Sequence, residues 1–306
     1  MAKKTVSDTK PERKAARSLS KKEKSILIAA AAVAVCVVLA LVVTTFAIQN
    51  NYYNDAVAAM NEGKYGEAIS IFEELSGYKD SKKQIENCCI SKFGEEQWNI
   101  MKDLKVNDVF TFGAYEQDNN LKNGKEAVEW IVVEQKGWSW LLVSKQALDC
   151  QQYNTAASDV TWEDSSVRKW MNGEFLNAAF SADEQLLIKD SEVSASGNPA
   201  FEVSAGNDTT DKVFLLSVKE AGKYFDSDAA RMCEPTAYAS SKNLYKSNSF
   251  SNENIDTTCR WWLRTPGDSQ SDAAVVYVNG AVGNAGRNVD YKQCGIRPAV
   301  WIDLKA

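Results

Sequence analysis

The hydrophobic pattern of the chain changes character three times, and its first apolar segment is continuous. Residues 26–48 (ILIAAAAVAVCVVLALVVTTFAI) form a run of 23 residues without a charged side chain. At about 1.5 Å of rise per residue, a helix of this length spans roughly 34 Å, enough for a hydrocarbon core of about 30 Å. A cleavable signal peptide is the alternative, but its apolar region is usually only about 7–15 residues long. We therefore expect a single transmembrane helix at residues 26–48.

The second segment, residues 50–95, has apolar positions at the helical spacings of three and four. They fall into two runs separated by Gly63, which predicts a helical hairpin, and the capping-box spacing of Ser81 and Gln84 predicts a third helix. The segment resembles one tetratricopeptide repeat, through Gly63-Lys64-Tyr65-x-Glu67-Ala68-Ile69 and Gly77-Tyr78-Lys79-Asp80. Because a single repeat cannot bury its own apolar face, we expect a helical stalk that packs on the next domain and acts as a spacer.

The third segment, residues 105–306, mixes strand and helix patterns. A face formed by Val167, Trp170 and Met171 predicts one helix, and capping boxes predict two more, at Ser181 with Glu184 and at Ser217 with Glu220. Short apolar or alternating runs predict strands at 128–132, 138–143, 211–217, 261–264, 273–279 and 296–304, with a tight turn at Asn279-Gly280. The expected fold class is α+β, with a β-rich C-terminal third.

Charge is distributed unevenly around the apolar run. Residues 1–25 contain nine Lys or Arg and three Asp or Glu, whereas residues 49–306 contain 26 basic and 38 acidic side chains. A basic N-terminal tail beside a transmembrane helix indicates a cytoplasmic N-terminus, so we expect the protein in the cell membrane with its C-terminal domain outside the cytoplasm. An acidic domain argues against nucleic acid as a partner, because phosphate binding needs a basic surface.

A set of motifs in the third segment resembles a bacterial family called domain of unknown function 6273, over about residues 105–304. Among these motifs are Gly113-Ala114-Tyr115, Trp162-Glu163-x-Ser165, Pro235-Thr236-x-Tyr238, Trp261-Trp262-Leu263-Arg264 and Gly295-Ile296-Arg297-Pro298. The ending is also similar to C-type-lectin-like domains, including the formylglycine-generating-enzyme branch. This second resemblance implies a lectin-like mixed fold for residues 105–306 and carries no function with it.

Several kinds of chemistry lack the residues they need. The chain has no histidine, which removes Ser-His-Asp and Cys-His arrangements and histidine metal sites. A phosphate loop and a CxxC motif are also missing from the sequence. Asn207, Asp208 and Asp211 could offer oxygens to calcium, but their spacing matches no known loop, and a polar turn is favoured there. We expect no enzymatic activity, no metal and no cofactor.

Seven cysteines are present, and four of them, Cys150, Cys233, Cys259 and Cys294, form an even set in the third segment. Outside the cytoplasm, such a set can form disulfides. Buried free thiols are the alternative, and the sequence does not choose between the two. If disulfides form, the pair that we favour is Cys259 with Cys294, tying two neighbouring strands together.

The stretch CRWWLRTPG, residues 259–267, combines aromatic surface and charge. In a structural interpretation both tryptophans fill the core, and Arg264 and Arg297 pair with buried acids. In a functional one, Arg264 lies near a recognition surface formed by the loop 268–272 and the hairpin tip 279–288, whose composition suits adaptable polar recognition. The candidate ligand-binding residues are Arg264, Asp268, Tyr277, Asn279, Asn284 and Arg287, and the candidate structural residues are Trp261, Arg297, Cys259 and Cys294.

The sequence therefore predicts a membrane-anchored extracytoplasmic protein that binds a glycan, peptide or protein ligand without catalysis. Two alternatives stay open. One is an enzyme, either of the formylglycine-generating type or a cell-wall hydrolase. The other is a structural partner in an envelope complex.

Overall fold

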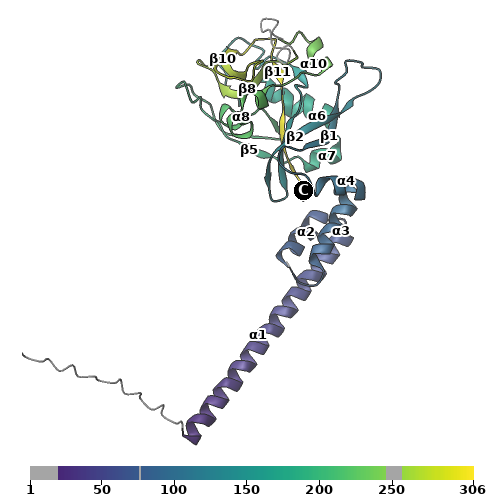
Figure 1. Cartoon of the computed structure of the whole chain (residues 1–306), viewed down its shortest axis with the longest axis vertical. Coiled ribbons are helices and arrows are strands. Elements are labelled where there is room, and N and C mark those ends of the chain that lie inside the picture. Colours follow the sequence, from purple (N-terminus) through teal and green to yellow (C-terminus); the bar gives the residue numbers. More distant parts are fainter. Residues whose placement is uncertain (1–19, 76, 246–256) are drawn as a thin grey trace, which may run out of the picture.

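The computed structural model describes residues 20–75, 77–245 and 257–306, so most of the predicted basic tail, residues 1–25, lies outside the described residues. Helix α1 (Lys21–Asn61) joins the apolar run and the first stalk helix into one helix of 41 residues. A capping box starts it, in which Ser20 accepts from the backbone of Glu23 and Glu23 accepts from that of Ser20. The helix projects from the rest of the molecule as a rod (Figure 1).

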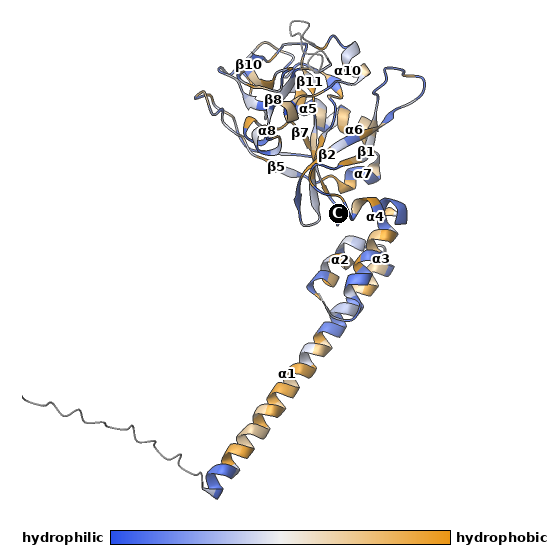
Figure 2. Cartoon of the chain, in the orientation of Figure 1, coloured by the Kyte–Doolittle hydropathy of each residue, from blue (hydrophilic) through white to orange (hydrophobic). Residues whose placement is uncertain are grey.

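The apolar part of α1 is long and hydrophobic enough to cross a bilayer, as a membrane anchor or a signal sequence is. None of its most apolar window is buried against other parts of the molecule. In Figure 2 this part is the long hydrophobic stretch of the rod, with polar residues at both ends. Most of its side chains therefore face away from the protein, although the ring of Phe46 meets that of Tyr78 with centroids 5.5 Å apart, and a lipid environment would suit the exposed apolar side chains.

Three further helices continue the stalk: α2 (Tyr65–Glu74), α3 (Ser81–Phe93) and α4 (Glu95–Met101). Gly63 has a φ of +77°, which lets the chain turn between α1 and α2 as predicted. The predicted capping box of α3 is wrong. The cap is Asp80, one residue earlier, and Gln84 donates to the Asp80 carboxylate at 3.0 Å, whereas the Ser81 hydroxyl donates to the carbonyl of Tyr78.

The stalk packs directly against the head, at the end of the head nearest to α1 (Figure 1). Glu73 of α2 accepts from the indole of Trp138 at 2.5 Å and from Lys305 at 2.9 Å. The rings of Trp98 and Trp138 stack with centroids 6.2 Å apart. One hydrophobic core runs from the stalk into the head, so the helices of the stalk bury their apolar faces together with those of the head.

The head contains two five-stranded sheets and a small two-stranded one. The first sheet has the order β1-β2-β3-β12-β7, and the second has the order β10-β9-β8-β11-β4. The strands of the first are β1 (Val109–Tyr115), β2 (Glu126–Lys136), β3 (Ser139–Ser144), β7 (Val213–Phe214) and β12 (Ala299–Asp303). Those of the second are β4 (Asp149–Cys150), β8 (Trp261–Pro266), β9 (Asp272–Val276), β10 (Val282–Asn288) and β11 (Gly295–Ile296), and β5 (Ser191–Val193) pairs with β6 (Thr209–Asp211).

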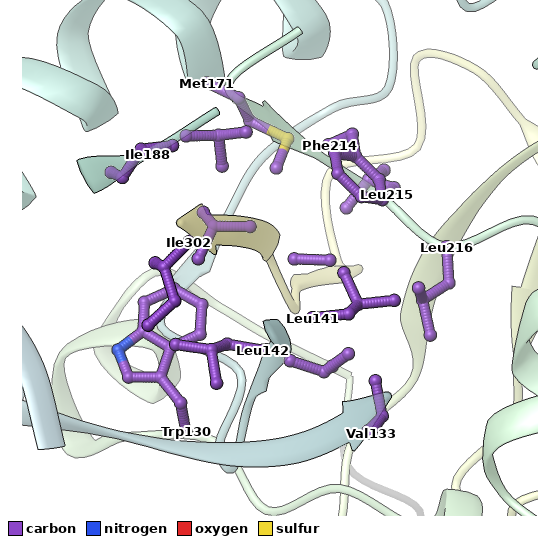
Figure 3. Close-up of a cluster of buried hydrophobic side chains, with 14 of the residues drawn as sticks. Trp130, Val133, Leu141, Leu142, Met171, Ile188, Phe214, Leu215, Leu216 and Ile302 are labelled. Atoms are coloured by element: carbon purple, nitrogen blue, oxygen red, sulfur yellow. The ribbon is translucent and has the colours of Figure 1, made fainter. Parts of the chain in front are cut away.

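Short helices cover these sheets. They are α5 (Ser166–Trp170), α6 (Leu176–Ala179), α7 (Ala182–Leu187), α8 (Val218–Tyr224), α9 (Asp228–Arg231) and α10 (Ala237–Ser241), with a π-helix, η1 (Met171–Phe175), between α5 and α6. The predicted capping boxes at Ser181 and Ser217 are confirmed. The class is therefore mixed helix and sheet. Figure 3 shows the core around the first sheet, where Leu142 and Ile302 pack with Met171 and Phe214.

Strand β10 replaces the hairpin tip that the sequence predicts at 279–288. Its glycines explain the difference. Gly283 lies under the ring of Tyr277, where an added Cβ would come within 2.6 Å of ring atoms. Gly286 has a φ of +79° and approaches the carbonyl of Ala273, at a bulge in the β9–β10 register. Pairing with β9 therefore makes a strand from residues of low strand propensity.

Candidate functional site

Strand β8 is the centre of the second sheet, and both of its tryptophans are fully buried. Their side chains project to opposite faces of the strand. The indole of Trp261 donates to the carbonyl of Arg231 at 3.1 Å, and that of Trp262 donates to the carbonyl of Gln151 at 3.0 Å. Because chain covers both faces of β8, both tryptophans belong to the core.

Arg264, near the end of β8, is turned inward. Only 4% of its surface is exposed, and its guanidinium forms an ion pair with Glu220 of α8, with an Nη2–Oε1 distance of 3.0 Å. Burial would raise the pKa of Glu220, but hydrogen bonds and attraction from Arg264 outweigh it and lower this pKa below its ordinary value. The structural interpretation, in which the buried Arg264 pairs with an acid, is confirmed because α8 brings Glu220 against it, and a contact of Arg264 with a ligand stays a prediction.

Arg297 is also buried, but it has no acidic partner among the described residues. Its guanidinium lies 4.6 Å from the ring centroid of Phe225 and 5.1 Å from that of Trp261, and its Nε donates to the carbonyl of Ser144 at 2.9 Å. The predicted pairing of Arg297 with a buried acid is therefore wrong. Aromatic rings and a backbone carbonyl take the place of the acid.

The cysteines of the head are free thiols, so the favoured Cys259–Cys294 disulfide is not formed. The neighbour of Cys259 is Cys233. The carbonyl of Cys233 accepts from the Cys259 amide at 2.8 Å, and the side chains of the two cysteines are hydrogen-bonded to each other. Strand β11 pairs Gly295 with Trp261, which places Cys294 level with Arg260 and one residue out of step with Cys259. Burial raises the pKa of the Cys259 and Cys294 thiols.

The oxygens of the candidate calcium turn, residues 206–211, do not converge. Asp208 accepts from the backbone of Ala195 at 2.6 Å. Asp211 is buried and accepts from Arg168 at 2.7 Å and from the indole of Trp162 at 3.0 Å. These carboxylates organise a loop and a helix, in agreement with the polar turn that the sequence favours.

Arg260, at the other end of β8, has a different environment from Arg264. It is 6% exposed, and its guanidinium lies over three half-buried tyrosine rings, with centroid distances of 4.4 Å to Tyr245 and 5.5 Å to both Tyr277 and Tyr291. Its buried Nε has no hydrogen-bond partner. Among the described residues Arg260 forms no ion pair, and its guanidinium contacts tyrosine rings instead.

Arg287 extends this arrangement outward from β10. It is exposed, and its guanidinium lies 5.5 Å from the centroid of the Tyr277 ring. Tyr277 therefore contacts two guanidinium groups, while Gly283 gives its ring room to lie across β10. We call Tyr245, Arg260, Tyr277, Arg287 and Tyr291 the Tyr–Arg cluster.

The other predicted ligand-binding residues do not join the cluster by hydrogen bonds or ion pairs in the described part of the chain. Asn279 is exposed in the β9–β10 turn, where its side chain accepts from the backbone of Ala281. Asp268 is exposed, and its backbone donates to Ala285. Asn284 is half-buried, and its carbonyl accepts from Asn198 at 2.7 Å. The structure thus brings together Tyr277 and Arg287, whereas Asp268 and Asn279 lie in loops and Asn284 lies in β10 outside the cluster.

Sequence reasoning missed Arg260, Tyr245 and Tyr291 as members of this site. Arg260 carries a sequence signal, since it is the first charge of the CRWWLR stretch. The two tyrosines carry none, because a tertiary contact assembles them: the backbone of Tyr245 donates to Gln293 at 3.1 Å, two residues from Tyr291. Sequence distance hides such a pair.

A second site that the sequence did not indicate is a pocket of about 590 Å³ beside the π-helix. Its wall combines an aromatic ring with polar groups, and includes Gln151, Gln152, Ser166, Lys169, Trp170 and Glu174. Gln152 donates to the carbonyl of Asp290 at 2.8 Å, so the pocket adjoins the segment that carries Tyr291. π-Helical turns are frequent at functional sites.

The described chain thus combines one helix able to cross a membrane, a packed helical stalk and a mixed helix-and-sheet head. The head carries a cluster rich in tyrosine and arginine. The chain belongs to the family described as domain of unknown function DUF6273, whose model matches residues 138–304, more than half of the sequence. The match begins at the turn before β3, so β1 and β2 both precede it. No curated protein and no solved structure matches the chain.

Proposed function

We propose that the protein is a membrane-anchored, extracytoplasmic binding protein without catalytic activity, and that its Tyr–Arg cluster recognises an acidic glycan. The observation that carries the proposal is Arg260, a buried charge with an unpartnered Nε that lies over three tyrosine rings and has no ion pair within the described residues. Burying an unpaired charge is costly. A ligand that brings a carboxylate or phosphate to this guanidinium would offset that cost.

The chemistry of the cluster supports an anionic ligand with ring-shaped surfaces. Arginine binds carboxylate and phosphate through parallel N–H donors. The Tyr277 ring is contacted by the guanidinium of Arg260 and also by a second one, that of Arg287. Half-exposed tyrosine rings give rigid contact area to the C–H face of a sugar at low entropic cost. An acidic peptide offers the same charge but lacks the stacking faces.

The architecture is consistent with this role at a membrane. The lysines at the start of α1 flank the apolar run on its N-terminal side, which favours a cytoplasmic N-terminus and an external head. The helical stalk, which we interpret as a tetratricopeptide-like spacer, holds the head next to the membrane. The two sheets and the buried WWLR strand support a C-type-lectin-like fold, a scaffold that hosts many ligands.

A binding experiment with the full chain in detergent micelles tests the proposal. We expect polygalacturonate to bind and neutral dextran not to bind, with affinity falling as salt increases because charge carries the interaction. Arg260→Met and Arg287→Gln should each weaken binding at least about tenfold, as loss of an anchoring arginine does. Lys219→Gln, the loss of an exposed charge on α8, should leave binding unchanged.

Three results would overturn the proposal. Equal binding of dextran and polygalacturonate would remove the role of charge. Equal losses in the Lys219→Gln and Arg287→Gln variants would indicate a diffuse charge effect instead of a site. Loss of binding in Trp170→Ala together with full binding in Arg260→Met would move the site to the pocket beside the π-helix.

A further inference from the structure

The loop between β1 and β2 gathers three carboxylates outside the Tyr–Arg cluster. Glu116 follows β1 directly, Asp118 lies two residues further on, and Glu126 begins β2. One oxygen from each of the three lies within 4.8 Å of the other two. The two ends of a ten-residue loop, 116–125, therefore meet at a common point of negative charge.

Hydrogen bonds within the loop hold two of these carboxylates in place. Glu126 accepts from the backbone amides of Gln117 at 2.7 Å and Asp118 at 3.3 Å. Asp118 accepts from the backbone of Asn120 and from the side chain of Asn123, each at 2.7 Å. These bonds fix the geometry, but they show no ligand by themselves.

Glu116 supplies the observation that points to a ligand. Only 8% of its surface is exposed, and its Oε1 is buried without a hydrogen-bond partner. No lysine or arginine forms an ion pair with any of the three carboxylates in the described ranges 20–75, 77–245 and 257–306. Lys125, which directly precedes Glu126 in the sequence, instead donates to the carbonyl of Ala178 at 2.6 Å. Burying an unpaired carboxylate among like charges is costly, and a bound cation would offset that cost.

We propose that Glu116, Asp118 and Glu126 bind a calcium ion. The donor set is entirely oxygen, which suits a hard cation and excludes sites that select soft metals. Two oxygens that bind the same Ca²⁺ at about 2.4 Å can be at most about 4.8 Å apart, the separation within which these ligand atoms lie. The exposed side of the loop leaves room for waters to complete six to eight ligands.

Magnesium fits these oxygens less well. It requires near-octahedral ligands at about 2.0–2.1 Å and gives up its waters reluctantly, so proteins usually hold it through one or two carboxylates, whereas this site offers three. The ion would tie the start of β2 to the end of β1, and it is independent of the anion recognition that we propose for the Tyr–Arg cluster.

Calorimetric titration of the EDTA-treated full chain in micelles tests the site with Ca²⁺ alone. We expect one ion per chain with a Kd on the order of 0.1–1 mM, the range of extracellular calcium modules. Addition of 10 mM Ca²⁺ should raise the Tm by a few degrees, about 5 °C if the Kd is near 0.1 mM. Glu126→Gln and Asp118→Asn should each weaken binding at least tenfold, whereas Glu192→Gln, at an exposed position on β5, should bind as the wild type does.

Glu116→Gln separates a ligand from a merely structural residue. Without calcium its Tm should equal or exceed that of the wild type, because one of three repelling charges is gone, and the Tm increase with calcium should disappear. A lower Tm without calcium and an unchanged increase with it would contradict the assignment. So would absence of calcium binding, equal stabilisation by Mg²⁺, or an equal loss in Glu192→Gln. Asp118→Asn, at an exposed position, keeps the test valid if the Glu116 variant does not fold.

Discussion

The two ends of β8 place an arginine in opposite situations. Arg264 is 4% exposed and meets the carboxylate of Glu220, which also caps α8. Arg260 is 6% exposed and lies over three tyrosine rings, with no ion pair in the part of the chain that the structure describes. Arg260 directly precedes β8 and Arg264 lies within it, and the two side chains are almost equally buried. Burial therefore does not distinguish a structural arginine from one that is available to a ligand, and the partner does.

The reason is electrostatic. In a buried ion pair each charge compensates the other, and removing one partner leaves the remaining charge uncompensated. Tyrosine rings stabilise a cation more weakly and leave its N–H donors unused. The Arg264 end is thus closed to further chemistry, whereas the Arg260 end can still accept an anion. Four predictions test this contrast, in order of decreasing effect on stability.

The largest effect is expected at Trp261, the first of the two tryptophans between the arginines. Trp261→Ala removes a fully buried indole from the core and should lower the free energy of unfolding by about 3–5 kcal/mol through the cavity it leaves. Thermal melts of the full chain in micelles, followed by tryptophan fluorescence, measure this. A loss below about 1 kcal/mol would mean that the core of the second sheet does not depend on β8.

The paired end should be next in sensitivity. Glu220→Gln removes the acid beside Arg264 and leaves a buried guanidinium unpaired, so we expect a loss of about 3 kcal/mol. The same melts measure it, with Glu192→Gln on β5 as a matched loss of an exposed carboxylate. Equal Tm values for the two variants would show that the pair contributes little.

Acid should weaken the same pair. The folded-state pKa of Glu220 is lowered below its ordinary value near 4.5. Its contribution to stability is therefore complete above that ordinary value and is lost as the pH falls through the folded-state pKa. The Tm of the wild type should fall more steeply between about pH 5 and pH 3 than that of Glu220→Gln. Parallel curves for the two proteins would contradict this assignment.

The smallest effect on stability is expected at the unpaired end. Arg260→Met exchanges an unpaired buried charge for an apolar side chain of similar length. The lost ring contacts and the relieved desolvation nearly cancel, so the Tm should stay within the equivalent of about 1 kcal/mol. Anion binding should nevertheless be lost. A large drop in Tm would give Arg260 the same structural role as Arg264.

Local pattern was sufficient where neighbours in sequence carry the physics. The apolar run of α1, the turn at Gly63 and the capping boxes at Ser181 and Ser217 depend on residues within four positions, and each was predictable. Asp80 shows the limit even there. A cap one residue earlier competes with Ser81, and helix ends are the least certain part of any pattern.

Tertiary structure decided which charges and thiols meet. Glu220 reaches Arg264 across 44 residues. Cys259 adjoins Cys233, while the pairing of β11 with β8 places Cys294 level with Arg260. β10 is a strand because β9 pairs with it. The sequence by itself determined the membrane-compatible helix, the helix starts and the hydrophobic strands, since local periodicity and capping specify these. The three-dimensional packing alone determined that Arg260 meets tyrosine rings, without an acidic partner among the described residues, and that Glu116 meets Asp118 and Glu126, because a partner for a charge is chosen across the fold.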